Sequence, residues 1–126
     1  MRVLMKFLVI DQSYTMRQNI LTILRNLGYN DFIEATDGRD GFEKLVTHRP
    51  DLIIMDLNIP DVSLKDFIQA VRTSPEFRHL PILAITTREL KRDLLRRLYA
   101  LVDTYLEKPF TPEMMRQKIH QILNFG

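Results

Sequence analysis

Short apolar stretches alternate with amphipathic stretches five times along this chain. The apolar stretches have the length of strands, and the amphipathic ones repeat their apolar residues at helical spacing. The predicted strands are Leu4–Ile10, Phe32–Thr36, Leu52–Asp56, Ile82–Thr86 and Thr104–Glu107. Strict alternation with short connections predicts an α/β fold, with one parallel sheet and helices on both of its faces.

Five helices are predicted from apolar residues three or four positions apart. Their apolar residues extend from Met16 to Leu27, Phe42 to Val46, Leu64 to Val71, Leu90 to Leu101 and Met115 to Leu123. Gly28 is a stop signal for the first, and the last begins with Thr111 as N-cap and Pro112 at the first helical position. Because no linker divides the sequence, we expect a single domain over residues 1–126.

Composition narrows the classes of function. The chain contains 27% charged and 45% hydrophobic residues, as a globular domain does, and a net charge of +2 gives no bulk argument for nucleic acid. The sequence has no cysteine, which excludes disulfides, thiolate catalysis and cysteine zinc sites. It also lacks an apolar run long enough for a signal peptide or a membrane span, so we expect a cytoplasmic protein without membrane insertion.

Polar residues stand where the predicted strands end. Asp11 follows the first strand, Asp56 and Thr86 end the third and fourth, and Lys108 follows the fifth. Because the carboxyl ends of parallel strands lie at the same edge of a sheet, these four side chains should converge. Ligands and chemistry in open α/β sheets are found at this edge.

The four side chains suit phosphoryl chemistry. Asp11 and Asp56 carry the oxygen ligands that Mg²⁺ prefers, and Asp56 could also accept a phosphoryl group as a nucleophile. The Lys108 ammonium and the Thr86 hydroxyl could stabilise charge on the transferred group. Positioning and charge stabilisation are most of what phosphoryl transfer requires.

Six stretches, in this order and spacing, form a specific set. They are Lys6–Asp11, Thr15–Arg17, Glu34–Gly38, Met55–Pro60, Pro81–Thr86 and Lys108–Phe110. Over nearly its whole length the chain resembles the receiver domains of two-component response regulators, in particular the CheY-like single-domain type known from chemotaxis. The resemblance implies a flavodoxin-like, five-stranded parallel sheet of order 2-1-3-4-5.

The resemblance also implies roles for single residues. Asp56 would be the phospho-acceptor for a sensor histidine kinase in a Mg²⁺-dependent step. Asp11, Asp56 and the backbone carbonyl of Asn58 would be metal ligands, and Lys108 would contact the phosphoryl group. It implies no enzyme activity beyond self-phosphorylation from a phosphodonor and autodephosphorylation.

Signal output is the other implied property. Thr86 would be the switch hydroxyl and Tyr105 the switch aromatic, with a downstream protein bound by the face of helix 4, strand 5 and helix 5. The Lys108–Pro109 bond is cis in the family, and an X-Pro bond carries a reduced cis penalty.

Position 12 departs from the family pattern. Two adjacent acids usually follow the first strand, and the second of them is the direct metal ligand. Here that position is Gln12, whose carbonyl oxygen could coordinate Mg²⁺ but carries no charge. We therefore expect weaker Mg²⁺ binding, with slower phosphorylation and dephosphorylation, than in a typical receiver.

Basic residues gather on the fourth predicted helix. They are Arg88, Lys91, Arg92, Arg96 and Arg97. They form either a solvated polar face or a surface for a protein partner. Direct nucleic-acid binding is not expected, because no aromatic residues are interleaved with these charges for base stacking.

Two alternatives come from other classes of function. Gln12 leaves open a phosphorylation-independent, receiver-like interaction module. A small flavodoxin-type redox carrier is disfavoured, because the turn after the first strand contains no glycine. That turn also places Asp11 where a cofactor phosphate would have to approach.

Overall fold

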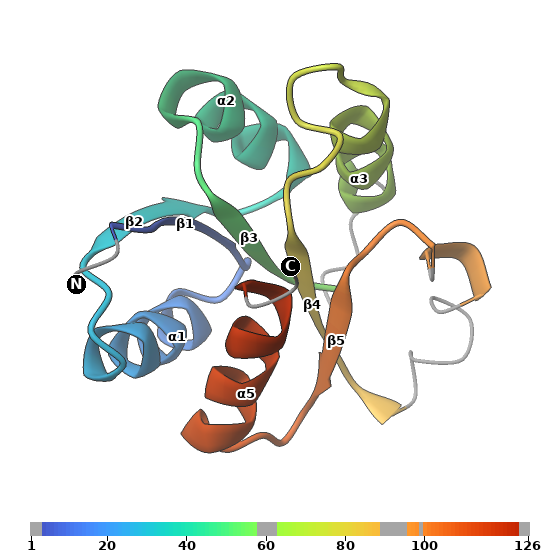
Figure 1. The fold of residues 1–126 in the computed structure, drawn as a ribbon. Coiled ribbons are helices and arrows are strands. Elements are labelled where there is room, and N and C mark those ends of the chain that lie inside the picture. Colours follow the sequence, from blue (N-terminus) through green and yellow to red (C-terminus); the bar gives the residue numbers. More distant parts are fainter. Residues whose placement is uncertain (1–3, 58–62, 89–95, 99, 124–126) are drawn as a thin grey trace.

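The computed structural model describes residues 4–57, 63–88, 96–98 and 100–123. Its five-stranded sheet has the order β2-β1-β3-β4-β5 with every neighbouring pair parallel, which confirms the predicted fold and strand order (Figure 1). The strands are β1 (Lys6–Ile10), β2 (Asp31–Ala35), β3 (Leu52–Asp56), β4 (Ile82–Thr86) and β5 (Thr104–Glu107). The predictions for β3, β4 and β5 have the observed bounds, whereas β1 begins later than predicted because the apolar run opens on Leu4, which is 81% exposed.

Helices cover both faces of the sheet, as predicted. The described helices are α1 (Tyr14–Asn26), α2 (Gly38–His48), α3 (Ser63–Thr73) and α5 (Pro112–Leu123). In Figure 1, α1 and α5 lie on one side of the sheet and α2 and α3 on the other. Much of the fourth predicted helix lies outside the described residues, but its Leu98 is buried in the core on the α2–α3 side. No helix in the described ranges is long and apolar enough to cross a bilayer.

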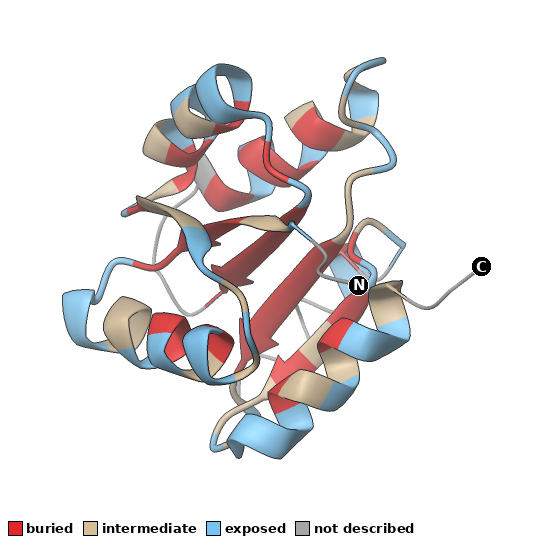
Figure 2. Cartoon of the chain, turned by 60° about the vertical axis from the view of Figure 1, so that its left-hand side comes forward, coloured by how far each residue is buried: buried red, intermediate tan, exposed pale blue. Residues whose placement is uncertain are grey.

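Alternating side chains of the central strands build two separate cores. Leu8 and Ile53 face α2 and α3, whereas Phe7 and Ile54 face α1 and α5. All four are completely buried, and the strands form the buried centre of the molecule in Figure 2. Packing on both faces fixes the strands and therefore the positions of the residues at their ends.

Local capping residues set the ends of α1 and α5. Gly28, with a φ of 100°, ends α1 in a Schellman motif, in which the Tyr29 N–H donates to the Leu24 carbonyl at 3.0 Å. The Thr111 hydroxyl caps α5 by accepting the Met114 N–H at 3.1 Å, and Pro112 is its first residue. These predicted stop and start signals are confirmed.

Arg72 organises the edge of the sheet opposite the predicted site. Its guanidinium donates to the carbonyl oxygens of Leu101 and Leu80, each at 2.7 Å. It also donates to Asp103 Oδ2 at 2.8 Å, and the same oxygen accepts the Ile82 N–H at 2.7 Å. One side chain from α3 thereby fixes the beginnings of β4 and β5, the two strands that carry Thr86 and Lys108 at their far ends.

We expect Arg72→Met to lower the free energy of unfolding by roughly 2–4 kcal/mol, because several charge-assisted hydrogen bonds are lost and the Leu80 and Leu101 carbonyls lose this donor. Arg78→Met is the matched control, because Arg78 is exposed. It should stay within about 0.5 kcal/mol of the parent. Urea unfolding measures both, and equal losses would contradict the bracing role of Arg72.

Candidate functional site

Backbone hydrogen bonds beyond the strand ends bring the predicted site residues together. The Leu57 N–H donates to the Ile85 carbonyl at 2.8 Å, which continues the pairing of β3 and β4 past Asp56. The Lys108 N–H donates to the Thr86 carbonyl, also at 2.8 Å. The carboxyl ends of β3, β4 and β5 are therefore held in register at one edge, as the sequence predicted.

Asp56 forms a buried ion pair with Lys108. The Lys108 Nζ lies 2.5 Å from Asp56 Oδ2, and Asp56 is only 3% exposed. The lysine side chain is 25% exposed, so its stem reaches from the surface inward to the carboxylate. The Lys108–Pro109 peptide bond is cis, as predicted. The pair places a positive charge at the carboxylate that was predicted to accept a phosphoryl group.

Asp11 is the second buried carboxylate of the site. It is 3% exposed, and its Oδ1 accepts the Ser13 N–H at 2.8 Å. Its Oδ2 is buried without a hydrogen-bond partner among the described residues. The pKa of Asp11 is raised from 3.8 to about 6, chiefly by burial and also by the neighbouring Asp56 carboxyl, while the Ser13 N–H and Lys108 oppose the rise. Asp11 and Asp56 are thus close enough to interact electrostatically.

The donor set fits a hard divalent cation. A buried carboxylate oxygen without a partner, beside a second carboxylate, is an environment that a cation bound through oxygen would stabilise. The set is small, since no three His, Cys, Asp or Glu side chains gather anywhere in the described part of the chain. Gln12 is exposed, and Asn58, whose carbonyl was predicted as a ligand, lies outside the described residues. Among described residues, the carboxylates of Asp11 and Asp56 would hold the ion.

The two predicted switch residues lie on neighbouring strands. Thr86 is 1% exposed at the end of β4, and its hydroxyl donates to the Thr87 carbonyl at 3.3 Å. Tyr105 pairs with Ala84 in the β4–β5 ladder and packs against the core on the α2–α3 side, with its hydroxyl oxygen buried. Their switching role stays a prediction.

Arg17 supports the site, a role that was not predicted from the sequence. Its Nη1 donates to the Asp11 carbonyl at 2.6 Å, and its Nε lies 2.9 Å from Glu34 Oε1. Gln18 donates to the same Glu34 oxygen at 2.9 Å. The arginine therefore ties α1 and β2 to the end of β1. The sequence did contain one signal for this ion pair. Glu34 is a charged residue within the predicted second strand.

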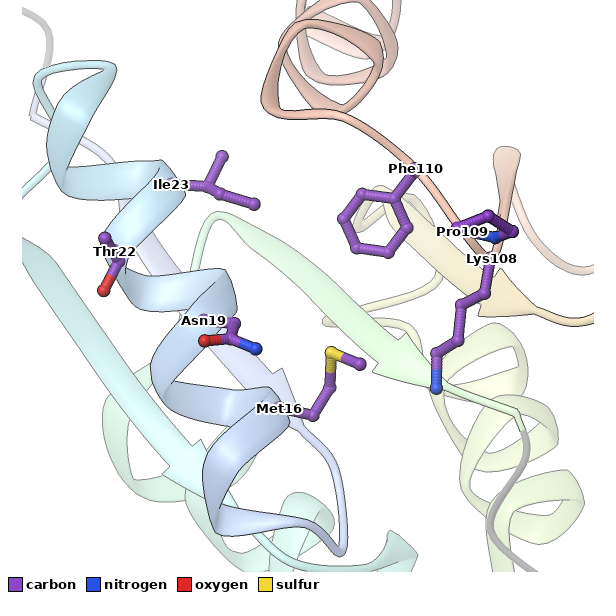
Figure 3. Close-up of a pocket in the computed structure, with 7 residues that line it drawn as sticks. All are labelled: Met16, Asn19, Thr22, Ile23, Lys108, Pro109 and Phe110. Atoms are coloured by element: carbon purple, nitrogen blue, oxygen red, sulfur yellow. The ribbon is translucent and has the colours of Figure 1, made fainter.

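A groove adjoins the site between α1 and the β5–α5 connection. It has a volume of about 700 Å³. Figure 3 shows its lining, which consists of Met16, Asn19, Thr22 and Ile23 from α1 and Lys108, Pro109 and Phe110 from the connection. Lys108 belongs to both the groove and the ion pair with Asp56, so a molecule seated in the groove would lie next to the carboxylate.

Comparison with known proteins decides the family. The family model described as the response regulator receiver domain matches residues 7–120. This chain belongs to that family. The receiver is 38% identical over 120 residues to the chemotaxis protein CheY1 of Helicobacter pylori, a match covering 94% of this chain and 97% of that protein. A CheY homologue of Campylobacter jejuni is 35% identical over 124 residues, covering 97% and 95%.

Solved structures agree with the fold of the receiver. Chemotaxis response regulator CheY4 of Vibrio cholerae superposes with a TM-score of 0.83 at 30% identity, covering 95% of this chain and 99% of that one. The receiver domain of a sensor histidine kinase from Pseudomonas aeruginosa gives a TM-score of 0.83 at 25% identity, covering 96% and 98%. That neighbour is described with a magnesium ion coordinated in its active-site cleft.

The raised pKa of Asp11 predicts a distinctive pH dependence without metal. The folded-state value of about 6 exceeds the ordinary 3.8, so the folded protein binds the proton more tightly than the unfolded chain does. In EDTA, stability should therefore fall as pH rises from about 4 to about 6 and level off above that. At about pH 7.5 we expect Asp11→Asn to be more stable than the parent by roughly 1–3 kcal/mol.

The Asp11→Asn variant should also lose most of this pH dependence, because the amide cannot titrate and can donate to Asp56. Urea unfolding at several pH values in EDTA measures both effects. Parallel stability profiles for parent and variant would show that the titration of Asp11 does not cause the pH dependence of stability.

Proposed function

We propose that this receiver is a phosphorylation switch in two-component signalling, in which a histidine kinase transfers a phosphoryl group to Asp56 in a Mg²⁺-dependent step. The observation that carries the proposal is the buried Asp56 carboxylate, held 2.5 Å from the Lys108 ammonium beside the unpartnered oxygen of Asp11. A buried lysine–acid pair alone could be structural. The second buried acid is what makes the site suited to a metal and a phosphoryl group.

Each site residue has a distinct task in the transfer. An Asp56 oxygen attacks the phosphorus, the new O–P bond forms, and the P–N bond of the kinase phosphohistidine breaks as the imidazole leaves. The Lys108 ammonium and the Thr86 hydroxyl stabilise negative charge on the phosphoryl oxygens. Asp11, Asp56 and the Asn58 carbonyl would hold Mg²⁺, which supplies further charge neutralisation. The protein then acts as a switch, with only self-phosphorylation and autodephosphorylation as activities of its own.

The groove beside Lys108 offers a route for the phosphodonor. Its apolar side chains Met16, Ile23 and Phe110 suit the apolar face of a helix, and its volume of about 700 Å³ leaves room for several side chains. A donor helix seated there would present its phosphohistidine at the edge where Asp56 lies. We therefore propose the groove as the contact surface for the kinase.

The surface that binds the downstream target would lie on the side of Lys108 away from the groove. Phosphorylation would shift Thr86 and Tyr105 and so change the affinity of the helix 4–β5–α5 face for a protein target. Arg88, Arg96 and Arg97 are exposed there, whereas Lys91 and Arg92 lie outside the described residues. The shift can be no larger than the difference in binding free energy between the two states. The chemotaxis proteins among its relatives make cytoplasmic chemotaxis signalling the first process in which to seek the target.

One observation favours a second candidate, a phosphorylation-independent interaction module. Gln12 is neutral and exposed at the position where the family pattern has a metal-binding acid. Such a module would use the same surfaces but would not respond to a phosphodonor.

Acetyl phosphate with Mg²⁺ should add the mass of one phosphoryl group to the protein, because Asp56 is the nucleophile. Asp56→Asn should abolish the adduct, whereas Asp66→Asn, at an exposed acid of α3, should leave it unchanged. Intact-mass spectrometry measures the yield, and EDTA should suppress it. An adduct that survives Asp56→Asn would overturn the assignment, and no adduct on the parent protein would favour the interaction module.

Gln12→Asp should tighten Mg²⁺ binding by about tenfold, since a third carboxylate adds charge worth on the order of 1–2 kcal/mol. Phosphorylation and dephosphorylation should both become faster. Gln12→Asn is the matched control, because it shortens the side chain without adding charge, and it should leave the affinity unchanged. An isothermal titration with MgCl₂ gives the affinities. Equal affinities for the parent and Gln12→Asp would refute the idea that the missing charge limits metal binding.

A further inference from the structure

Helix α2 presents apolar side chains on its outer face as well as on the face that packs on the sheet. On the inner face, Gly41 is buried so close to β1 that a Cβ there would lie 2.7 Å from Ile10 Cδ1. The helix is therefore seated directly on the sheet. Phe42 and Val46, which are 38% and 51% exposed, lie one turn apart on the outer face. A rigid helix thus holds two apolar side chains toward the solvent.

A second groove runs beside Phe42, between α2 and α3, which lie on the same face of the sheet (Figure 1). Its volume is about 270 Å³, and its walls are almost entirely apolar. The lining consists of Gly38, Arg39 and Phe42 from α2 and of Asp66, Phe67 and Ala70 from α3. Phe42 is both a wall of the groove and a half-exposed ring. The surface therefore combines a projecting aromatic ring with a hollow that can receive another.

Two charges of opposite sign border this second groove. Arg39 is exposed on the α2 wall and Asp66 is exposed on the α3 wall. Within the described ranges, neither side chain takes part in an ion pair. By contrast, the exposed Arg49 at the end of the same helix pairs with Glu76 at 2.5 Å. The charges of Arg39 and Asp66 are thus available to a molecule that covers the groove.

We propose that this α2–α3 surface, made of Arg39, Phe42, Val46 and Asp66, binds a second copy of the same chain through a two-fold contact. Every interaction in such a contact occurs twice, so the surface has to be complementary to itself. Phe42 of each copy enters the groove of the other, and Arg39 of each copy faces Asp66 of the other. The occupant is a second copy because one surface supplies the ring, the hollow and both charges.

The contact is small and leaves the phosphorylation site accessible. One pair of helices buries less than the roughly 1,200 Å² of a standard interface, so we expect a reversible dimer with a dissociation constant on the order of 100 µM. The α2–α3 surface lies on the other side of the sheet from α1 and α5 (Figure 1), so the groove beside Lys108 stays open. Acetyl phosphate therefore reaches Asp56 in either state, and the adduct yield with Asp66→Asn is not affected.

Analytical ultracentrifugation of the unphosphorylated protein tests the pairing. The parent should be monomeric at about 1 µM and largely dimeric at about 1 mM. Phe42→Ser should weaken association by at least about tenfold, because it removes the buried ring from both halves of the contact. Leu4→Ser is the matched control, since Leu4 is an exposed apolar residue that precedes β1, and it should change nothing.

Circular dichroism checks that both variants are folded, so a loss of association is a loss of the contact. A parent that stays monomeric at the highest concentration would overturn the proposal. So would a Phe42→Ser protein that associates as the parent does, or equal effects of Phe42→Ser and Leu4→Ser.

Charge reversal tests the two-fold geometry independently. Arg39→Asp and Asp66→Arg each bring like charges together twice in a symmetric pair, so each variant alone should self-associate at least about tenfold more weakly than the parent. An equimolar mixture of the two variants should associate within about threefold of the parent, because every contact between unlike copies then joins opposite charges. A fluorescent label on one variant follows the mixed dimer in the centrifuge. A mixture that associates no better than either variant alone would overturn the two-fold contact.

Discussion

Two carboxylates buried side by side at one edge of a parallel sheet are the constraint on which the rest of this receiver depends. Asp11 and Asp56 repel each other and are both removed from water, so the unliganded fold must tolerate an unfavourable charge. The Lys108 ammonium offsets the charge of Asp56. Within the described ranges, the Asp11 carboxylate receives only the Ser13 N–H, at one of its oxygens. The scaffold has to be stable enough elsewhere to keep this edge in place.

That stability comes from the sheet interior and from the opposite edge. Leu8 and Ile54 illustrate the two completely buried cores, one on each face, that fix the strands between the helices. Arg72 then holds the beginnings of β4 and β5 through hydrogen bonds to carbonyl oxygens and to Asp103. The unsatisfied oxygen of Asp11 thus lies at the edge of the sheet where a ligand can reach it.

The sequence predicts the strands and the convergence of the site well, because both depend on local patterns. Apolar runs define β3, β4 and β5 to the residue, and parallel pairing requires their carboxyl ends to share an edge. The ion pair of Arg17 with Glu34 was not predicted, because it depends on how α1 is rotated above β2. The groove beside Lys108 depends on the gap between α1 and a loop, which no pattern of residues encodes. The uncommitted oxygen of Asp11 also required the structure, since a sequence shows an acid but not which of its oxygens is occupied.

The same oxygen bears on the choice between a phosphorylation switch and a module that uses only its surfaces. A module of that kind needs no cation, and an asparagine at position 11 would keep the bond from Ser13 and remove the repulsion with Asp56. The acid at position 11 therefore costs folding stability that such a module could recover with a single substitution. A metal-dependent switch needs that charge, because the ion must be held by few ligands once residue 12 is neutral. The neutral Gln12 and the buried Asp11 are thus compatible with the proposed switch, in which Asp11 and Asp56 would hold the ion.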